Sequence, residues 1–241
     1  MAVNGANITS IPLWQDNKPL PIDQNRLHPV TSSTTGKTVY NYHSASVDDA
    51  TKACDSARVA LKSWKNATVA QRRSVLNKFA DIVERDAEKF KHLQAEETAA
   101  GGLWAQSNVS ILVNYTREIA AIISSVTGDI PAIDKPNTMG FVFKEAVGTV
   151  LLIPPWNGAL VLAARGLCMA IAAGCTVVMK ASELCPATHH ALVEAFMEAG
   201  LPAGVLNKIT VARPDAAQGK LLEGTSSFHS TDLLALQLQN L

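Results

Sequence analysis

The chain has 241 residues, enough for one large domain or two small ones. Hydrophobic residues make up 47% and charged residues 17%, a composition that excludes an intrinsically disordered protein. Lysine plus arginine and aspartate plus glutamate number 21 each, so the chain has no net charge and no basic stripe. We therefore expect no nucleic-acid partner, because phosphate neutralisation supplies most of that affinity.

The beginning of the chain lacks the features of a secretory signal. Residues Met1 to Pro12 contain neither a charged n-region nor a continuous apolar run. The apolar stretch from Ala146 to Met179 is long enough for a membrane span, but prolines and glycines interrupt it, and we expect none. Without a secretory signal, and with no C-x-x-C pair or regular cysteine framework, we expect reduced thiols in a cytoplasmic protein. The four cysteines are Cys54, Cys168, Cys175 and Cys185.

Residues 1–45 are expected to form an irregular N-terminal segment, because its prolines exclude helix. These prolines are Pro12, Pro19, Pro21 and Pro29. Within the segment, Thr31 to Tyr42 is polar and β-branched around Gly36. This pattern predicts a short hairpin or an edge strand.

Residues 46–138 are predicted to be helical. Ser46 is a suitable N-cap for a first helix, in which apolar residues recur at three- and four-residue spacing. Thr68 and Gln71 form a capping-box pattern at the start of a second helix.

The extents of these helices follow from their apolar faces. The second helix is expected to continue to Phe90, and a third to run from about Gln106 to Val126, with Val126 facing inward. The three helices are interpreted as a packing scaffold.

The period of the hydrophobic pattern changes at Met139, and residues 139–217 are predicted to be a partial cofactor-binding domain. Continuous apolar runs separated by helical patterns predict β-α-β-α-β, half of a doubly wound parallel sheet of the α/β class. A half sheet ending at Val211 is expected to leave an unpaired apolar edge. The predicted strands are Met139–Lys144, Val147–Ile153, Thr176–Met179 and Val205–Val211, and the helices begin near Leu160 and at Pro186.

Two loops at the carboxyl edge of this sheet are candidate binding loops, because ligands of such sheets bind there. In the first, Pro154 and Pro155 fix the backbone and Trp156 can form a pocket wall. The amide of Asn157 is a neutral donor that can stabilise an oxyanion, or it can simply cap the following helix. The local pattern leaves both interpretations open.

The second loop carries Lys180 and Glu183. A carboxylate accepts from the hydroxyls of a nucleotide ribose and an ammonium donates to them. The alternative is an ordinary solvated ion pair. His189 and His190 follow on a helix, where adjacent residues point about 100° apart and cannot chelate one metal together. We expect solvated histidines and no metal site.

Three segments together resemble the NAD(P)-dependent aldehyde dehydrogenase superfamily: Glu145–Asn157, Ala172–Glu183 and Glu198–Asn207. The run from Ala57 to Thr98 is similar to the N-terminal helices of that family, and the resemblance covers roughly residues 15 to 215. It implies N-terminal helices plus half of a Rossmann-like parallel sheet. It also implies a β-hairpin around Met139 to Glu145 that helps oligomerise.

The resemblance implies a role for each matching residue. Asn157 would be the oxyanion donor, and Pro154, Pro155 and Trp156 would line the nicotinamide side of the groove. Lys180 and Glu183 would hold the adenosine ribose of NAD or NADP. The K-A-S-E sequence with Arg165 in the preceding helix is similar to the salicylaldehyde- and vanillin-type branch, which places Arg165 toward an aromatic aldehyde. The implied reaction oxidises an aldehyde to a carboxylic acid.

The sequence departs from the family in its last part. The reaction needs a cysteine nucleophile and a glutamate base, and none of the four cysteines stands in a suitable position. Residues 218–241 form a divergent tail in which Gly224–Ser227 only partly resembles the glycine-rich turn for the pyrophosphate.

A chain truncated before the catalytic cysteine is therefore expected, inactive alone and with cofactor binding weakened or lost. The alternatives are a non-catalytic nucleotide-binding or interaction protein, as a homo-oligomer or paired with a full-length relative, and the product of a shortened reading frame.

Overall fold

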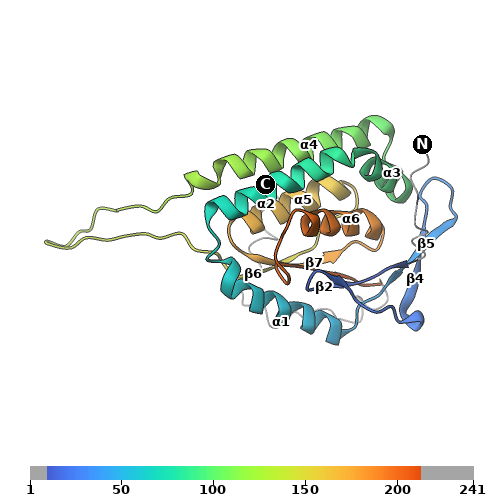
Figure 1. Ribbon diagram of the computed structural model, residues 1–241, viewed down its shortest axis with the longest axis horizontal. Helices are drawn as coiled ribbons and strands as arrows, with labels where there is room; N and C mark the ends of the chain where they lie inside the picture. The colour runs from blue at the N-terminus through green and yellow to red at the C-terminus, as the bar shows by residue number, and fades with distance from the viewer. Residues whose placement is uncertain (1–9, 213–241) are drawn as a thin grey trace.

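A five-stranded sheet in the order β3-β2-β8-β7-β6 forms the centre of the computed structural model, which describes residues 10–212 (Figure 1). Its last three strands are parallel, and two helices connect them, which confirms the predicted β-α-β-α-β order. The elements are β6 (Thr149–Leu152), α5 (Ala159–Ala172), β7 (Thr176–Ala181), α6 (Pro186–Glu198) and β8 (Leu206–Thr210).

Both faces of the parallel strands are covered, as their apolar sequences indicate. Helix α1 lies below the sheet in Figure 1, while α5 and α6 lie above it. Gly174 and Gly200 end the two connecting helices with φ angles of +83° and +88°, a left-handed conformation that glycine adopts at little cost.

The expected free edge at Val211 is wrong. Strand β2 (Trp14–Gln15) pairs antiparallel with β8 through Trp14 and Lys208, and β3 (Lys18–Pro19) pairs with β2. An N-terminal hairpin thus covers β8, and in the described part of the sheet the outermost parallel strand is β6. The pairing joins segments almost 200 positions apart, so no local pattern indicates it.

A second sheet in the order β1-β5-β4 corrects the expectation that residues 1–45 are irregular. It consists of β1 (Ser10–Ile11), β4 (Leu27–Thr31) and β5 (Thr38–His43), with a 3-10 turn at Gln24–Arg26. The predicted hairpin is confirmed and already begins at Leu27. Pro29 and Pro19 exclude helix, but they lie on outermost strands, where a missing N–H is tolerated.

Four helices build the rest of the described body: α1 (Val47–Trp64), α2 (Val69–Arg85), α3 (Ala87–Thr98) and α4 (Gly102–Ile122), followed by a 3-10 turn at Ile123–Ser125. Both predicted N-caps are confirmed. Ser46 forms a capping box with Asp49, and Thr68 forms one with Gln71.

Two predicted helix extents are wrong. The second helix ends at Arg85, because the ψ angle of 24° at the C-cap Asp86 leaves the helical region, and Phe90 is buried on α3 instead. The third helix begins at Gly102 and ends at Ile122. Val126 is 63% exposed rather than inward, because the chain has left the helical body at this point.

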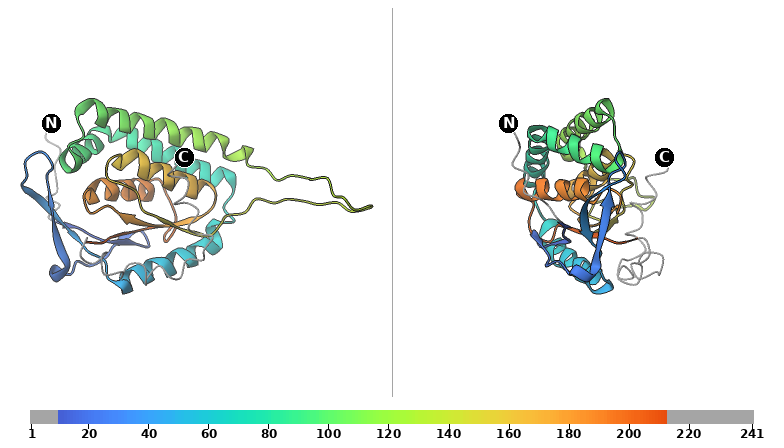
Figure 2. Two further views of the ribbon diagram at one scale, coloured as in Figure 1. Left: turned by 180° about the vertical axis from the view of Figure 1, so that it is seen from behind. Right: turned by 90° about the vertical axis from the view of Figure 1, so that its right-hand side faces the viewer.

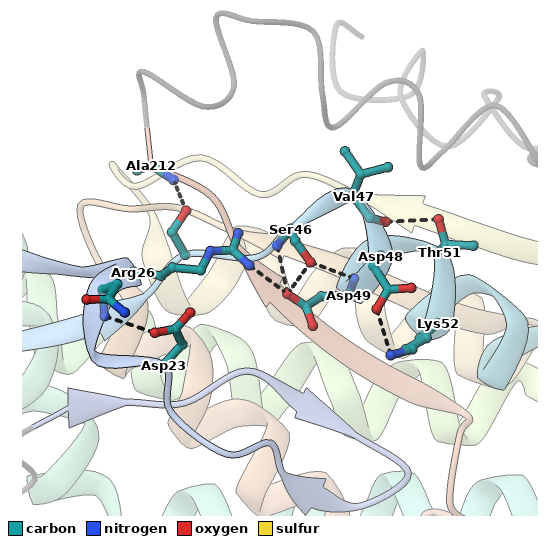
Figure 3. A network of polar contacts seen from close by, with 11 residues as sticks. Asp23, Arg26, Ser46, Val47, Asp48, Asp49, Thr51, Lys52 and Ala212 are labelled. Atoms are coloured by element: carbon teal, nitrogen blue, oxygen red, sulfur yellow. Dashed lines mark hydrogen bonds and ion pairs between the residues drawn. The ribbon is translucent and has the colours of Figure 1, made fainter.

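Helices α2, α3 and α4 form an outer layer over α5 and α6 (Figure 2). The rings of Phe79 on α2 and Phe196 on α6 stack with centroids 3.8 Å apart, which joins the two layers. A polar network fixes the opposite side (Figure 3). Arg26 pairs with Asp49 at 3.1 Å, and the hydroxyl of Ser44 accepts from the amide of Ala212 just beyond β8.

Residues 126–148 form a long arm that projects from the body (Figure 1). The predicted strand Met139–Lys144 is wrong, because one isolated bridge between Asp129 and Val142 is the only β pairing described in the arm. With no helix packed on it, its side chains stay open to solvent, and Phe143 is 79% exposed. Among residues 10–212, no helix is both long and apolar enough to cross a membrane.

Candidate functional site

The two predicted binding loops lie side by side at the carboxyl edge of the sheet. Leu152 at the end of β6 is in register with Met179 of β7, and β7 continues for two more residues to Ala181. The first loop, Pro154 to Asn157, then enters α5, and the second leads from β7 to α6. The predicted end of this strand at Met179 is wrong: Lys180 still pairs with Ile209 of β8, and Glu183 follows in the loop. The topology brings both predicted groups to one edge.

Asn157 is exposed at the end of the first loop. The N-cap of α5 is Gly158, and no side chain caps this helix, so the capping interpretation of Asn157 is wrong. Among the described residues, the Asn157 amide has no hydrogen-bond partner. Trp156 beside it is 48% exposed, while Pro154 is buried and supports the loop from below. The amide therefore retains its donors for a ligand.

Lys180 and Glu183 form an ion pair with 3.3 Å between the ammonium nitrogen and a carboxylate oxygen. Their side chains are only 14% and 18% exposed, unlike an ordinary solvated pair. Charges shielded in this way benefit from further hydrogen bonds, which ribose hydroxyls can provide.

A pocket of about 440 Å³ connects the two loops, since Trp156 and Glu183 both line it. Its opposite wall comes from the N-terminal sheet, where the rings of His28 and Tyr42 stack 5.7 Å apart. Local sequence patterns do not predict this wall. The only signal was the aromatic content of the strand ending at His43, which does not indicate where the strand packs.

Glu97 at the end of α3 also lines the pocket and is almost completely buried. Its carboxylate accepts from the backbone amides of Ala187 and Thr188 at 2.8 Å each, and from the hydroxyls of Thr188 and Tyr40. Burial raises the pKa of Glu97 to about 7, while these donors favour the charged form. Glu97 thus caps α6 from a distant helix and holds the helix that follows the second loop.

The expectation of solvated histidines on α6 is wrong. His189 is fully buried and His190 is 6% exposed, because α6 packs against the sheet on one face and α2 and α3 on the other. Burial lowers the pKa of His189 to about 3 and that of His190 well below its ordinary value. Both rings are therefore neutral at physiological pH.

All four cysteines are buried and free of disulfides. Burial raises the pKa of Cys168 to about 12 and that of Cys185 well above its ordinary value. A nucleophilic cysteine needs an accessible thiolate, which an apolar environment disfavours. Neither thiol has the environment of a nucleophile.

Arg165 is not brought to the two loops. It lies eight positions beyond Asn157 on α5, about 12 Å further along the helix axis. Its charge acts instead on Tyr115 of α4, where it opposes the increase in pKa that burial causes. Arg165 is not among the described residues that line the pocket. Residues 213–217 of the predicted cofactor segment, the predicted tail 218–241 and the turn Gly224–Ser227 lie outside the described residues.

Comparison with known sequences connects this geometry to a family. Residues 21–224 match the aldehyde dehydrogenase family. Salicylaldehyde dehydrogenase of Pseudomonas putida is 40% identical over 190 residues, which cover 79% of this chain and 38% of the relative. Vanillin dehydrogenase of Pseudomonas fluorescens is 35% identical over 208 residues, which cover 86% of this chain and 43% of the relative.

Solved structures give the same result. The crystal structure of a salicylaldehyde dehydrogenase from Pseudomonas putida G7 complexed with salicylaldehyde superimposes with a TM-score of 0.86 at 33% identity, covering 91% of this chain and 45% of that chain. Betaine aldehyde dehydrogenase from Staphylococcus aureus in complex with NAD+ has a TM-score of 0.81 at 25% identity, covering 86% and 42%. The chain spans about two-fifths of the length of the curated relatives it matches, 38% and 43% for the two above.

Proposed function

Because the chain belongs to the aldehyde dehydrogenase family, we propose that residues 10–212 supply the nucleotide-binding and oxyanion-stabilising parts of NAD(P)-dependent oxidation of an aldehyde to a carboxylic acid. One observation carries the proposal. Asn157 and the Lys180–Glu183 pair lie at the carboxyl ends of neighbouring parallel strands, and one pocket extends from Trp156 to Glu183.

The second loop fits a nucleotide ribose. Glu183 accepts from ribose hydroxyls, and Lys180 donates to them while it neutralises the carboxylate. Trp156, beside Pro155, gives the pocket a flat apolar wall at the other loop. When bound, NAD(P) supplies the oxidant.

The first loop supplies the oxyanion donor. When a nucleophile attacks the aldehyde carbon, negative charge develops on the carbonyl oxygen, and the Asn157 amide donates to it. Such a donor contributes about 3 kcal/mol to transition-state stabilisation in comparable sites. Its exposure and its lack of a partner among residues 10–212 support this role.

The nucleophile is not one of the four cysteines in our proposal, so the 241-residue chain alone does not turn over aldehyde. Purified protein with NAD+ or NADP+ and an aldehyde should show no cofactor reduction. Any cofactor reduction by the purified chain would contradict this proposal, and its loss on conversion of one cysteine to serine would identify that cysteine as the nucleophile.

We propose an aromatic aldehyde as the substrate, because salicylaldehyde and vanillin dehydrogenases are among the relatives above 30% identity. Arg165 is the candidate residue on the substrate side. Its place on α5, outside the cofactor pocket, is consistent with a contact to the aldehyde rather than to the nucleotide.

Cofactor binding tests the proposal directly. Titration of NAD+ and NADP+ by calorimetry should detect binding that weakens about 10- to 100-fold in Glu183→Gln and in Lys180→Met, because each loses a charge-assisted hydrogen bond. Asn157→Ala should leave the affinity within about threefold, since its amide faces the reacting oxygen. Equal affinities in all variants would refute the assignment of the ribose loop.

The projecting arm favours a second function, pairing with another copy or with a full-length relative. Phe141 and Phe143 stack 6.4 Å apart and are 58% and 79% exposed, a surface that a partner would cover. Co-expression with a full-length relative should give co-purification, and Phe141→Ser with Phe143→Ser should abolish it. Retention in the double variant would argue against this function.

A further inference from the structure

Between the two binding loops lies a buried imidazole that has no role so far. His189 is fully buried on the first turn of α6. Its Nδ1 accepts a hydrogen bond from the backbone amide of Ser182 at 3.1 Å. Ser182 stands between Lys180 and Glu183, so the ring holds the backbone of the ribose loop at its centre.

The other side of the same ring faces the start of α5, directly after the first loop. The backbone of Ala159, the first residue of α5 and two positions after Asn157, acts on the ring and opposes the decrease in its pKa that burial causes. Because Nδ1 accepts from an amide, the single proton of the neutral ring is on Nε2. Nε2 also lies 3.6 Å from the sulfur of Cys185. One ring thus contacts the ribose loop and lies beside the helix that follows the first loop.

Burial keeps this arrangement in one protonation state. The pKa of His189 is lowered to about 3, so the ring stays neutral and Nδ1 stays an acceptor at any pH where the protein functions. The Ser182 amide is buried with it, and a buried amide without an acceptor is unfavourable. The contact therefore restrains the loop strongly.

We propose that His189 is a positioning residue that sets the ribose loop against the start of α5, where the oxyanion loop ends. The inference rests on the proposed function, since it assigns these loops to the cofactor and to the aldehyde oxygen. His189 touches neither ligand and acts through Ser182 and Ala159.

Two amide substitutions separate the two sides of the ring. In His189→Asn the side-chain oxygen replaces Nδ1 and can still accept from Ser182. In His189→Gln the terminal amide replaces Nε2, and the acceptor for Ser182 is lost. His190→Gln is the matched control, because His190 is a buried neighbour whose ring contacts Trp14 and Glu194 instead of the loops.

The hydrogen-exchange rate of the Ser182 amide measures whether its hydrogen bond to His189 is present, and it needs no cofactor. We expect exchange at least about tenfold faster in His189→Gln than in the wild type, the factor for loss of one hydrogen bond. His189→Asn and His190→Gln should stay within about threefold. Equal exchange in His189→Gln and His189→Asn would overturn the positioning role.

NAD+ titration gives the functional readout. The dissociation constant should rise about tenfold in His189→Gln and less than about threefold in His189→Asn. Unchanged affinity in His189→Gln despite faster Ser182 exchange would also overturn the role. Absence of NAD+ binding by the wild type would refute the proposed function instead, and Ser182 exchange would still decide whether His189 holds the loop.

Discussion

Lys208→Met should stabilise the protein, because Lys208 is a buried cation without a carboxylate partner among residues 10–212. The side chain lies on β8 and is fully buried, and its ammonium donates to the carbonyl of Pro12 at 2.8 Å. Burial lowers the pKa of Lys208 from 10.5 to about 7. Methionine has a similar length and carries no charge to desolvate.

The pKa difference sets both the size and the pH dependence of the gain. Below pH 7 the lysine is protonated in both the folded and the unfolded state. Burial of the charged ammonium then lowers the free energy of unfolding by its full amount, about 5 kcal/mol. As pH rises from about 7 toward 10.5, the unfolded chain binds more protons than the folded one, so the stability of the wild type increases. The buried lysine therefore lowers the free energy of unfolding by about 4 kcal/mol at pH 7 and by about 2 kcal/mol at pH 9.

Loss of the hydrogen bond to Pro12 offsets about 1 kcal/mol of this gain. We therefore expect Lys208→Met to raise the free energy of unfolding by about 3 kcal/mol at pH 7 and by about 1 kcal/mol at pH 9. Urea unfolding followed by fluorescence of the buried Trp14 and Trp64 measures both values.

Lys78→Met on the exposed face of α2 is the matched control and should change stability by less than about 0.5 kcal/mol at either pH. A Lys208→Met protein that is no more stable than the wild type at pH 7 would refute the reasoning. The same gain at pH 7 and pH 9 would show that the effect is packing rather than charge.

Three further substitutions test the framework around the site by urea unfolding. Glu97→Ala should lose about 3 kcal/mol or more, since it leaves the first amides of α6 without an acceptor, and a loss below about 1 kcal/mol would contradict this cap. Ser46→Ala should lower the free energy of unfolding by about 1 kcal/mol, because it removes the capping box with Asp49. An unchanged stability would mean that packing alone holds α1 and would contradict this prediction. Gly174→Ala should lower the free energy of unfolding by about 1–2 kcal/mol, because the φ of +83° is left-handed and the added carbon would meet Arg72 at 2.7 Å. An unchanged midpoint of urea unfolding would mean that the turn relaxes to accept the added carbon.

Much of the candidate site could be predicted from the sequence because its residues lie at or shortly after the carboxyl ends of strands. The positions of Asn157, Lys180 and Glu183 depend only on where β6 and β7 end, and parallel strands end at a common edge. The capping alternative for Asn157 could not be resolved in this way, because Asn and Gly are both accepted at an N-cap and the structure uses Gly158.

The burial of His189 and His190 was not predictable from their neighbours in the chain. A histidine on a helix is polar by composition, and whether it is solvated depends on what packs against that helix. Here the sheet and helices α2 and α3 enclose α6 on opposite faces. The burial of Lys208 was not predictable either, because it depends on the pairing of β2 with the edge of β8.

The sequence by itself determined the local features of this protein: the capping boxes at Ser46 and Thr68, the glycine stops after α5 and α6, and the order of strands and helices. These depend on residues three or four positions apart, and their physical causes act within one turn. The tertiary structure alone decided the pairing of β2 with β8, the pocket wall formed by His28 and Tyr42, and the position of His189 between two loops. These contacts join distant segments, and only the packed chain brings such segments together.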